Sequence, residues 1–347
     1  MTPIVVGIAG PLLSPDERRM LAEVDPAGVI LFARNVVDPP QLRALTAALR
    51  AATDRADLAL LIDQEGGPVA RLRPPLWPAF PAASVFADAY ARAPMTAIQA
   101  ARANGEALGH VLAAAGITMN AAPVLDLTHA GADPVLADRT FGSDPLQVAA
   151  LGRAWVEGMA TAGVVAIVKH LPGHGRATVD PHHALPVVTP DAEALAADFA
   201  PFRRLSSYAV AGMVGHVVYA AWDPERPASL SPTVIGQVVR DTIGFDGLLL
   251  SDDLHMGALS GGMAERAAAA IVVGCDLALC CHATPTDVRA IAARLGPIAP
   301  AAAARLARAT PSRPDAVVDP GEAIARRDTL LSASNLSVRL AMPGGNA

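Results

Sequence analysis

The segment GLLLSDD at residues 247–253 ends a run of apolar residues with two carboxylates. A short, continuous apolar run is typical of a strand buried on both faces, as in a parallel sheet. A carboxylate at the end of such a strand is costly to bury unless it is paired, hydrogen-bonded or functional. Asp252 is therefore a candidate nucleophile or metal ligand, whereas we expect Asp253 to cap the following helix.

Similar apolar runs recur along the chain and alternate with alanine-rich stretches of helical composition. This alternation predicts a β/α protein with a buried parallel sheet. Eight strands over more than about 250 residues predict an α/β fold of the (β/α)8 barrel type, with residues 1–347 as a single domain. The predicted strands are 4–9, 28–32, 58–63, 117–123, 164–169, 212–217, 247–252 and 276–281, and the predicted helices include 39–52, 96–116, 145–163 and 263–274.

Polar residues interrupt these runs at their C-terminal ends, which in a (β/α)8 barrel form the active-site face. A doubly wound open sheet also binds ligands at strand ends, but its GxGxxG phosphate turn is missing from this chain. We therefore favour the barrel. The residues concerned are Asp63, Asp126, Lys169, His170, His216, Asp252 and Asp253.

One loop, VKHLPGHGRATVDPHHALP at residues 168–186, contains four of the nine histidines and the only lysine, Lys169. All other basic residues are arginine, so a lysine at this position indicates a requirement for a compact ammonium group. An ammonium is a point charge, whereas guanidinium is a wide planar fork that a tight polar pocket can exclude. The alternative is that one lysine survived by chance.

Within this loop, Asp180 and His182 are two residues apart. In an extended segment both side chains point to the same side, so the carboxylate can hydrogen-bond the imidazole and orient it for acid and base chemistry. Gly173 and Gly175 indicate a mobile backbone that could bring the pair over a bound substrate.

Two chemistries are compatible with these residues. In a metal-dependent hydrolase, zinc is held by His170, His174, His182 and Asp252. In a metal-free glycosyl transfer, Asp252 attacks an anomeric carbon and His182 protonates the leaving oxygen. Because no HxH pair lies at a strand end and Lys169 adjoins the proposed metal, we expect no metal and no cofactor. A non-catalytic sugar-binding barrel would not need the Asp180–His182 pair.

Composition excludes several classes of protein. The chain is 52% hydrophobic and 17% charged, which is enough apolar material for a large core. A net charge of −6 and the absence of a basic run argue against nucleic-acid binding. The first residues contain neither a signal peptide nor a membrane span, so we expect no membrane partner. Clustered Cys275, Cys280 and Cys281 indicate buried free thiols, and we expect a cytoplasmic monomer.

Several segments in order along the chain resemble glycoside hydrolase family 3, and within it the single-domain bacterial β-N-acetylglucosaminidases. The resemblance spans almost the whole chain, and the combination is specific although each segment alone is modest. The matching segments are GVILFARN at 28–35, LIDQEGGPVARLR at 61–73, APVLDL at 122–127, DRTFGSDP at 138–145, KHLPGHG at 169–175, DPHHALP at 180–186, PASLSP at 227–232 and GFDGLLLSDDLHM at 244–256.

This resemblance implies retaining hydrolysis through a covalent glycosyl-enzyme, with Asp252 as nucleophile, His182 as general acid and base, and Asp180 as its partner. It also implies a pocket for the terminal N-acetylglucosamine of a cell-wall fragment, a muropeptide, as small-molecule or oligosaccharide substrate. The implied pocket residues are Asp63, Arg71, Arg139, Lys169 and His170. His174 and His183 have no implied role, and we expect them to hold loop structure.

A phosphorylase acting on β-N-acetylglucosaminides is a close rival, because a neutral histidine tolerates an incoming phosphate better than a carboxylate does. The chain also departs from the family pattern. Pro68 stands where arginine is usual, Leu171 where phenylalanine is usual, and Pro181 where serine is common. Pro181 could stiffen the loop that carries Asp180 and His182.

Overall fold

Eight parallel strands close into a barrel in this computed structural model, which describes residues 1–310 and 318–334. Each strand pairs with its neighbours in chain order, and β1 pairs with β10 to complete the ring. All eight predicted strands are present, so the prediction of a single-domain (β/α)8 barrel is confirmed. The barrel strands are β1 (Thr2–Gly7), β2 (Pro26–Leu31), β3 (Ala59–Ile62), β4 (Met119–Asn120), β5 (Val165–Leu171), β7 (Ala211–Val214), β9 (Leu248–Asp253) and β10 (Leu277–Cys280).

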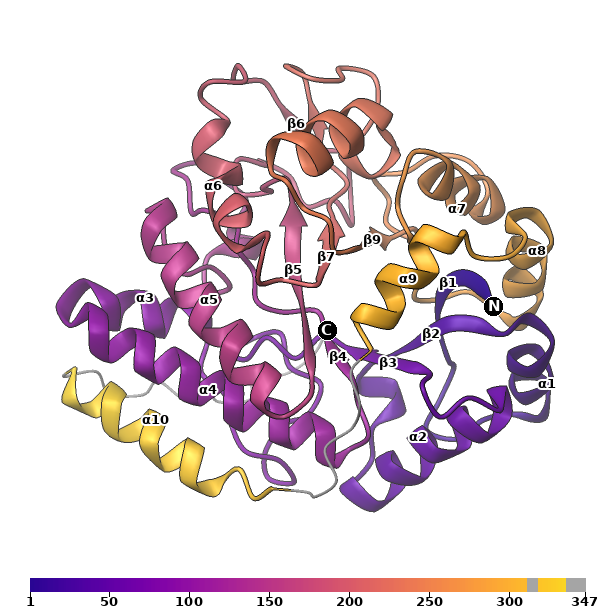
Figure 1. The fold of residues 1–347 in the computed structure, drawn as a ribbon, viewed down its shortest axis with the longest axis horizontal. Coiled ribbons are helices and arrows are strands. Elements are labelled where there is room, and N and C mark those ends of the chain that lie inside the picture. Colours follow the sequence, from indigo (N-terminus) through magenta and orange to yellow (C-terminus); the bar gives the residue numbers. More distant parts are fainter. Residues whose placement is uncertain (311–317, 335–347) are drawn as a thin grey trace.

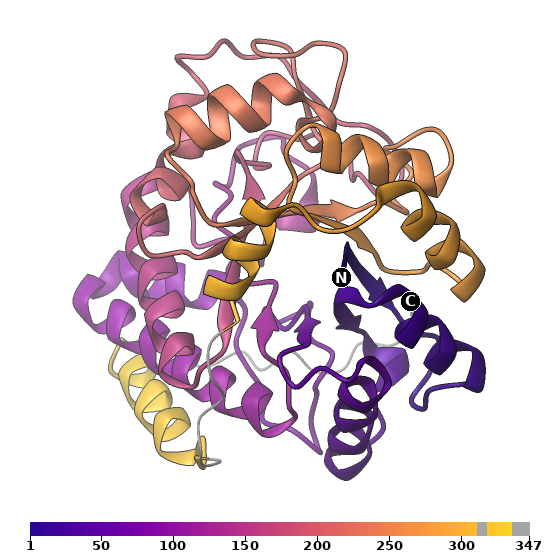
Figure 2. The same ribbon diagram turned by 45° about the vertical axis from the view of Figure 1, so that its right-hand side comes forward.

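Helices surround these strands on the outside of the barrel (Figures 1 and 2). The four predicted helices correspond to α2, α4, α5 and α7. The α-helices are α1 (Pro15–Val24), α2 (Pro39–Thr53), α3 (Ala83–Arg92), α4 (Pro94–Ala114), α5 (Pro145–Thr161), α6 (Ala196–Leu205), α7 (Met263–Val272), α8 (Pro285–Leu295), α9 (Pro300–Arg308) and α10 (Gly321–Ala333). Shorter 3-10 helices cover Ala33–Asn35, Pro134–Leu136 and Ala228–Leu230, and Val234–Thr242 winds as a π-helix.

Local sequence explains where several helices begin. The side chain of Asp38 accepts a hydrogen bond from the Gln41 backbone and is followed by proline at the first helical position of α2. Proline is favoured there because its missing N–H group would have no partner within the helix. Thr284 and Asp287 form a reciprocal capping box at the start of α8.

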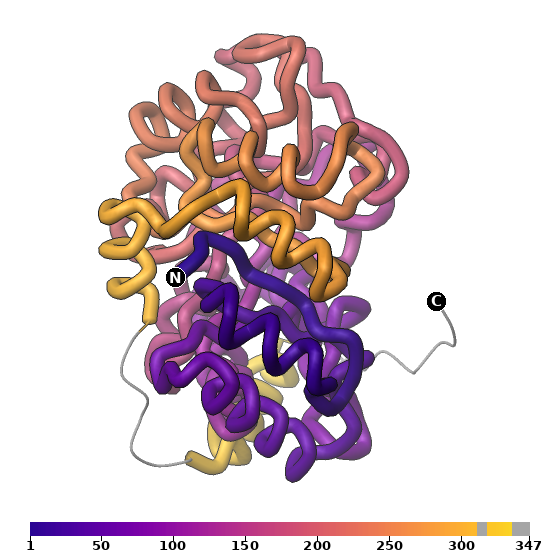
Figure 3. Tube along the Cα trace, turned by 90° about the vertical axis from the view of Figure 1, so that its right-hand side faces the viewer, coloured from indigo at the N-terminus to yellow at the C-terminus, as the bar shows by residue number. Residues whose placement is uncertain are grey.

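The first and last units of the barrel lie side by side, as Figure 3 shows for the indigo N-terminal part of the tube and the orange part that contains α8. β1 is in register with β10 through Ile4 and Ala278, and α1 packs against α8. This pairing closes the sheet, so the barrel has no exposed strand edge that could pair with another chain.

Two apolar layers lie on opposite sides of the strands. In β9, Leu248 and Leu250 belong to the core inside the barrel, whereas Leu249 belongs to the layer between strands and helices. This is the two-residue alternation of a strand. Because both faces are covered, the sequence of each strand reads as a continuous apolar run.

One feature, a second sheet, lies outside the predicted pattern. A small parallel sheet of β6 (Val187–Val188) and β8 (Val218–Tyr219) follows the histidine-rich loop. After the barrel, α10 packs against α4 (Figure 1). No helix in the described ranges 1–310 and 318–334 is long and apolar enough to cross a membrane.

Candidate active site

The inward-facing rows of the barrel strands continue beyond the apolar core into polar side chains at the C-terminal mouth. In β9 the row Leu248, Leu250 continues to Asp252, and in β5 the row Val165, Ile167 continues to Lys169. A period of two therefore brings these side chains to one place. They line a cavity of about 530 Å³.

All eight residues predicted to form the site line this cavity: Asp63, Arg71, Arg139, Lys169, His170, Asp180, His182 and Asp252. They come from three strand ends and from three loops, so only the barrel closure brings them together. The cavity also includes residues that the sequence reasoning missed, among them Glu65, Phe32, Arg34, Met256 and His282.

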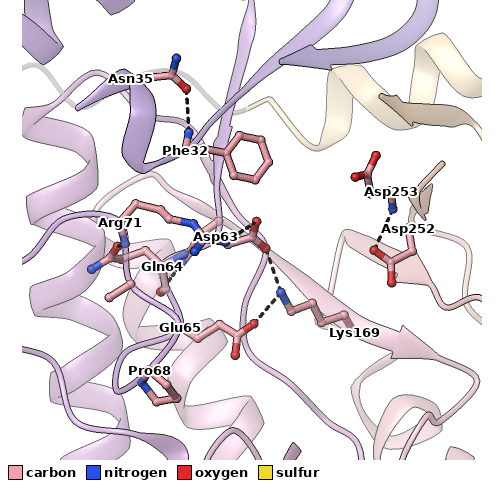
Figure 4. Close-up of polar contacts among 12 residues, drawn as sticks. Phe32, Asn35, Asp63, Gln64, Glu65, Pro68, Arg71, Lys169, Asp252 and Asp253 are labelled. Atoms are coloured by element: carbon pink, nitrogen blue, oxygen red, sulfur yellow. Dashed lines mark hydrogen bonds and ion pairs between the residues drawn. The ribbon is translucent and has the colours of Figure 1, made fainter. Parts of the chain in front are cut away.

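Asp252 ends β9 with only 6% of its surface exposed. Its Oδ1 atom accepts a hydrogen bond of 2.8 Å from the backbone N–H of Asp253 (Figure 4). Within the described part of the chain, no group donates a hydrogen bond to its Oδ2 atom. One carboxylate oxygen is thus fixed by the backbone, and the other is free to react with a group in the cavity.

Asp253 does not cap a helix, contrary to the prediction, because α7 begins only at Met263. Its Oδ1 atom instead accepts from the backbone N–H groups of His255 and Cys281, at 3.2 and 3.1 Å, and lies 3.1 Å from His255 Nδ1. The side chain therefore joins the end of β9 to the end of β10. This contact holds the segment on which Asp252 lies.

Lys169 reaches between the carboxylates of Asp63 and Glu65, across the cavity from Asp252 (Figure 4). Its Nζ atom lies 3.0 Å from Asp63 Oδ1 and 2.7 Å from Glu65 Oε1. Burial by itself lowers the pKa of Lys169, but Asp63 and Glu65 outweigh it and raise that pKa, so the group remains an ammonium.

Two arginines extend this row of alternating charges. Arg139 donates from Nε and Nη2 to the two oxygens of Glu65, both at 2.9 Å, and Arg71 Nη2 lies 3.6 Å from Asp63 Oδ2. Burial alone raises the pKa of Glu65, but Lys169 and Arg139 lower it to about 2. The row is Arg71, Asp63, Lys169, Glu65 and Arg139, and it presents cationic N–H donors and carboxylate acceptors together, as recognition of sugar hydroxyl groups requires.

Glu65 lies on the segment that follows β3, and Gln64 fixes that segment. The Gln64 side chain accepts from the backbone N–H groups of Arg71 and Leu72 and donates to the Leu72 carbonyl oxygen. Gly66 turns the chain with a φ of 98°, a conformation that favours glycine. Pro68, the departure from the family pattern, lies in this turn with its ring exposed.

A buried pair of a carboxylate and a histidine lies beside this row of charges. Asp126 is fully buried, and its Oδ2 atom lies 2.7 Å from His170 Nδ1. Its Oδ1 atom accepts from the backbone N–H groups of His170 and His174, at 3.2 and 2.7 Å. Burial raises the pKa of Asp126, but His170 and the other donors outweigh it and lower that pKa. Asp126 therefore stays ionised and orients the His170 ring toward the cavity.

Asp180 and His182 do pair, but through a turn and not through the extended segment that we predicted. Asp180 Oδ1 lies 2.7 Å from His182 Nδ1 and also accepts from the His182 backbone N–H at 2.9 Å. The backbone of His183 donates to the Asp180 carbonyl oxygen at 3.0 Å, which closes a turn with Pro181 in its second position. Proline suits that position because its φ is already fixed there.

The electrostatics of this pair suit an acid and base. Burial raises the pKa of Asp180, but the hydrogen bonds from the backbone and side chain of His182 together outweigh it and lower that pKa. The carboxylate is therefore ionised and favours Nδ1–H on the ring, which leaves Nε2 to exchange a proton with a bound group. His182 lies at the cavity rim with 60% of its side chain exposed.

The two remaining histidines of the loop do not hold backbone groups as we expected. His183 is exposed. His174 is buried, and neither of its ring nitrogens has a hydrogen-bond partner among the described residues. Burial, with a further contribution from His170, lowers the pKa of His174 to about 4, so its ring is neutral.

The zinc alternative required four ligands that all line the cavity: His170, His174, His182 and Asp252. Over residues 1–310 and 318–334, no three histidine, cysteine or acidic side chains converge as a metal-binding group. His170 and His182 each direct Nδ1 at a carboxylate. All three cysteines are buried and unpaired, as predicted.

The barrel mouth thus holds a buried carboxylate, an imidazole and carboxylate pair at the rim, and a row of hydrogen-bond donors and acceptors. These groups suit an enzyme that cleaves glycosidic bonds. Comparison with known proteins agrees. Residues 8–302 match the glycosyl hydrolase family 3 N terminal domain.

Similar proteins are named beta-hexosaminidases. A beta-hexosaminidase of Alkalilimnicola ehrlichii is 42% identical over 310 residues, which cover 88% of each chain. One from Thiobacillus denitrificans is 40% identical over 311 residues, covering 88% of this chain and 85% of the relative. The crystal structure of NagZ from Neisseria gonorrhoeae in complex with N-trifluoroacetyl-D-glucosamine is 33% identical, with a TM-score of 0.87 and coverage of 96% and 98%. The chain belongs to glycosyl hydrolase family 3.

Proposed function

We propose that this family 3 glycoside hydrolase, a β-N-acetylhexosaminidase, is a retaining, exo-acting enzyme that removes terminal non-reducing N-acetylglucosamine. One observation carries the proposal: the buried Asp252 carboxylate and the Asp180–His182 pair line the same cavity. Two groups of this kind are what a double-displacement mechanism needs, although most retaining glycosidases use two carboxylates.

In the first step, Asp252 Oδ2 attacks the anomeric carbon of the bound sugar, and the bond from that carbon to the leaving oxygen breaks. His182, doubly protonated, gives the proton on Nε2 to the leaving oxygen. The products are a covalent ester between Asp252 and the sugar, the released alcohol, and a neutral His182. Asp180 stabilises the imidazolium before the transfer, because the carboxylate is ionised beside it.

In the second step, the neutral His182 takes a proton at Nε2 from a water molecule. The water oxygen attacks the anomeric carbon, and the ester bond to Asp252 breaks. Because the sugar carbon is inverted twice, the product keeps its original configuration. Asp180 again holds the ring in the tautomer that leaves Nε2 available.

The same cavity supplies the groups that hold the sugar. Lys169, Arg71 and Arg139 donate to sugar oxygens, while Asp63 accepts from hydroxyl groups, and His170 adds a ring fixed by Asp126. The amino-sugar preference is supported by the similarity to a structure that contains N-trifluoroacetyl-D-glucosamine.

We propose that the natural substrates are cell-wall fragments that end in N-acetylglucosamine. The enzyme would act on them as a monomer in the cytoplasm, during peptidoglycan recycling. Three buried cysteines without a disulfide suit a reducing compartment.

The decisive experiment traps the covalent intermediate. A 5-fluoro analogue of N-acetylglucosamine with an activated leaving group should accumulate the ester, and peptide mass spectrometry should find the sugar on Asp252. Asp252→Ala should fold normally and lose turnover by more than about a thousandfold, because the covalent step is gone. A label on another residue, or full activity of Asp252→Ala, would contradict the mechanism.

A second experiment, with added inorganic phosphate, distinguishes a hydrolase from a phosphorylase. Turnover of an aryl N-acetyl-β-glucosaminide is measured with and without inorganic phosphate, and the sugar product is identified. Free N-acetylglucosamine at an unchanged rate supports the hydrolase. A sugar 1-phosphate formed in preference to the free sugar identifies a phosphorylase.

A further inference from the structure

The loop that carries Asp180 and His182 is anchored firmly in its first half. Arg176 Nε and His129 Nε2 each lie 2.6 Å from a different oxygen of Asp198, whose side chain is 3% exposed. The Ala177 carbonyl oxygen accepts from the backbone N–H of Asp133 at 2.9 Å. These contacts fix residues up to about 177 against the barrel, but they do not reach the tip of the loop.

The tip is held from another direction, by the segment that follows β9. The backbone N–H of Gly257 donates to the His182 carbonyl oxygen at 3.2 Å, and that of Ala258 donates to the Pro181 carbonyl oxygen at 3.0 Å. This segment begins five residues after Asp252 in the sequence. The acid and base residue and the buried carboxylate are therefore joined by a short path of backbone.

Gly257 allows this approach because it has no side chain. A Cβ atom on Gly257 would lie 2.8 Å from the His182 carbonyl oxygen and 3.3 Å from that of His183. The nearer contact is shorter than real Cβ atoms show, and the obstructing atom belongs to the backbone, so one of the two segments would have to move. Gly257 does not have the positive φ that would by itself favour glycine.

We propose that Gly257 is a positioning residue for His182: its missing side chain lets the segment after β9 hold the acid and base residue in place over the cavity. This inference rests on the proposed function, because it assigns Gly257 a role only through proton transfer by His182. Gly257 itself does not touch the substrate in this proposal.

The test variant is Gly257→Ala, with Gly236→Ala as its matched control, since a Cβ atom on Gly236 meets nothing within 4 Å. The substrates are aryl N-acetyl-β-glucosaminides with leaving groups of graded acidity. We expect Gly257→Ala to lower kcat/KM by about tenfold for poor leaving groups and less than about twofold for activated ones, which need little protonation. Gly236→Ala should match the kcat/KM of the wild type with every substrate, and thermal unfolding should show that both variants are folded.

A double variant asks whether Gly257 acts through His182. In a His182→Ala background, Gly257→Ala should cause no further loss, because the effects of residues that act as a unit do not add. The positioning role would be overturned by equal losses for all leaving groups or by losses that add in the double variant. It would also be overturned if the wild type is active and Gly257→Ala has the same kcat/KM. An inactive wild type would contradict the proposed function instead.

Discussion

The ammonium of Lys169 lies 2.7 Å from Glu65 Oε1, in a position where both side chains are almost fully buried. Glu65 also binds Arg139 through two hydrogen bonds, so one carboxylate holds two of the cations that we assign to the sugar pocket. Glu65 can therefore affect substrate binding without contacting the substrate, since the positions of Lys169 and Arg139 depend on it.

Glu65→Gln should therefore weaken both folding and substrate binding. The amide keeps the shape of the side chain, but it leaves Arg139 without its carboxylate partner and Lys169 with Asp63 alone. Breaking a buried ion pair in this way typically costs about 3 kcal/mol. We expect a loss of this size in the free energy of unfolding and a rise of KM of about tenfold. Denaturant unfolding and steady-state kinetics measure the two effects.

Glu157, a half-buried residue whose two partners are exposed, provides the control for that variant. It pairs with Arg102 and Arg153, whose side chains are 55% and 48% exposed. Surface ion pairs of this kind contribute less than about 1 kcal/mol. Equal destabilisation by Glu65→Gln and Glu157→Gln would show that burial of the Lys169–Glu65 pair has no energetic consequence.

Lys169→Arg tests why the only lysine of the chain occupies this position. A guanidinium is wider than an ammonium, and it would have to fit between Asp63 and Glu65, which now lie 3.0 and 2.7 Å from one nitrogen atom. We expect KM for N-acetyl-β-glucosaminides to rise about tenfold or more. Sugar affinity equal to that of the wild type would mean that lysine persists here by chance.

Most of the barrel could be predicted from the sequence, because strands buried on both faces leave a continuous apolar pattern. GLLLSDD shows this best: Leu248 and Leu250 face inward, and the same alternation brings Asp252 to the mouth. The small sheet of β6 and β8 escaped prediction since each strand has only two residues, too few for any period to be visible.

The site was predictable where residues end strands or match family motifs, and less so where contacts depend on the fold. Glu65 was missed although it follows Asp63 by two residues, the spacing of one strand face; its partners Lys169 and Arg139 are distant in sequence. Gly257 had no signal either, because its role depends on a loop 75 residues earlier. The Asp180–His182 turn was misjudged since Pro181 favours a turn over an extended segment.

His182→Ala should separate proton donation from the rest of catalysis. We expect kcat/KM to fall by about a thousandfold for poor leaving groups and by about tenfold for strongly activated aryl groups, because the latter leave without protonation. Added azide should restore part of the rate by attacking the covalent intermediate without a base. Losses of the same size across the leaving-group series would exclude His182 as the acid.

Stability should depend on pH through His174, whose pKa is lowered from 6.5 to about 4 in the folded protein, chiefly by burial. Between pH 4 and pH 6.5, His174 binds a proton in the unfolded chain but not in the folded chain. The contribution of the neutral ring to the free energy of unfolding is therefore fully present above pH 6.5 and is lost as the pH falls toward 4. The shift corresponds to a loss of about 2 to 3 kcal/mol across the window. His174→Gln cannot titrate, so its free energy of unfolding should fall less between pH 7 and 4 than that of the wild type. His183→Gln changes an exposed ring and should keep the wild-type slope, whereas identical slopes for all three proteins would show that His174 does not stay neutral in the folded state.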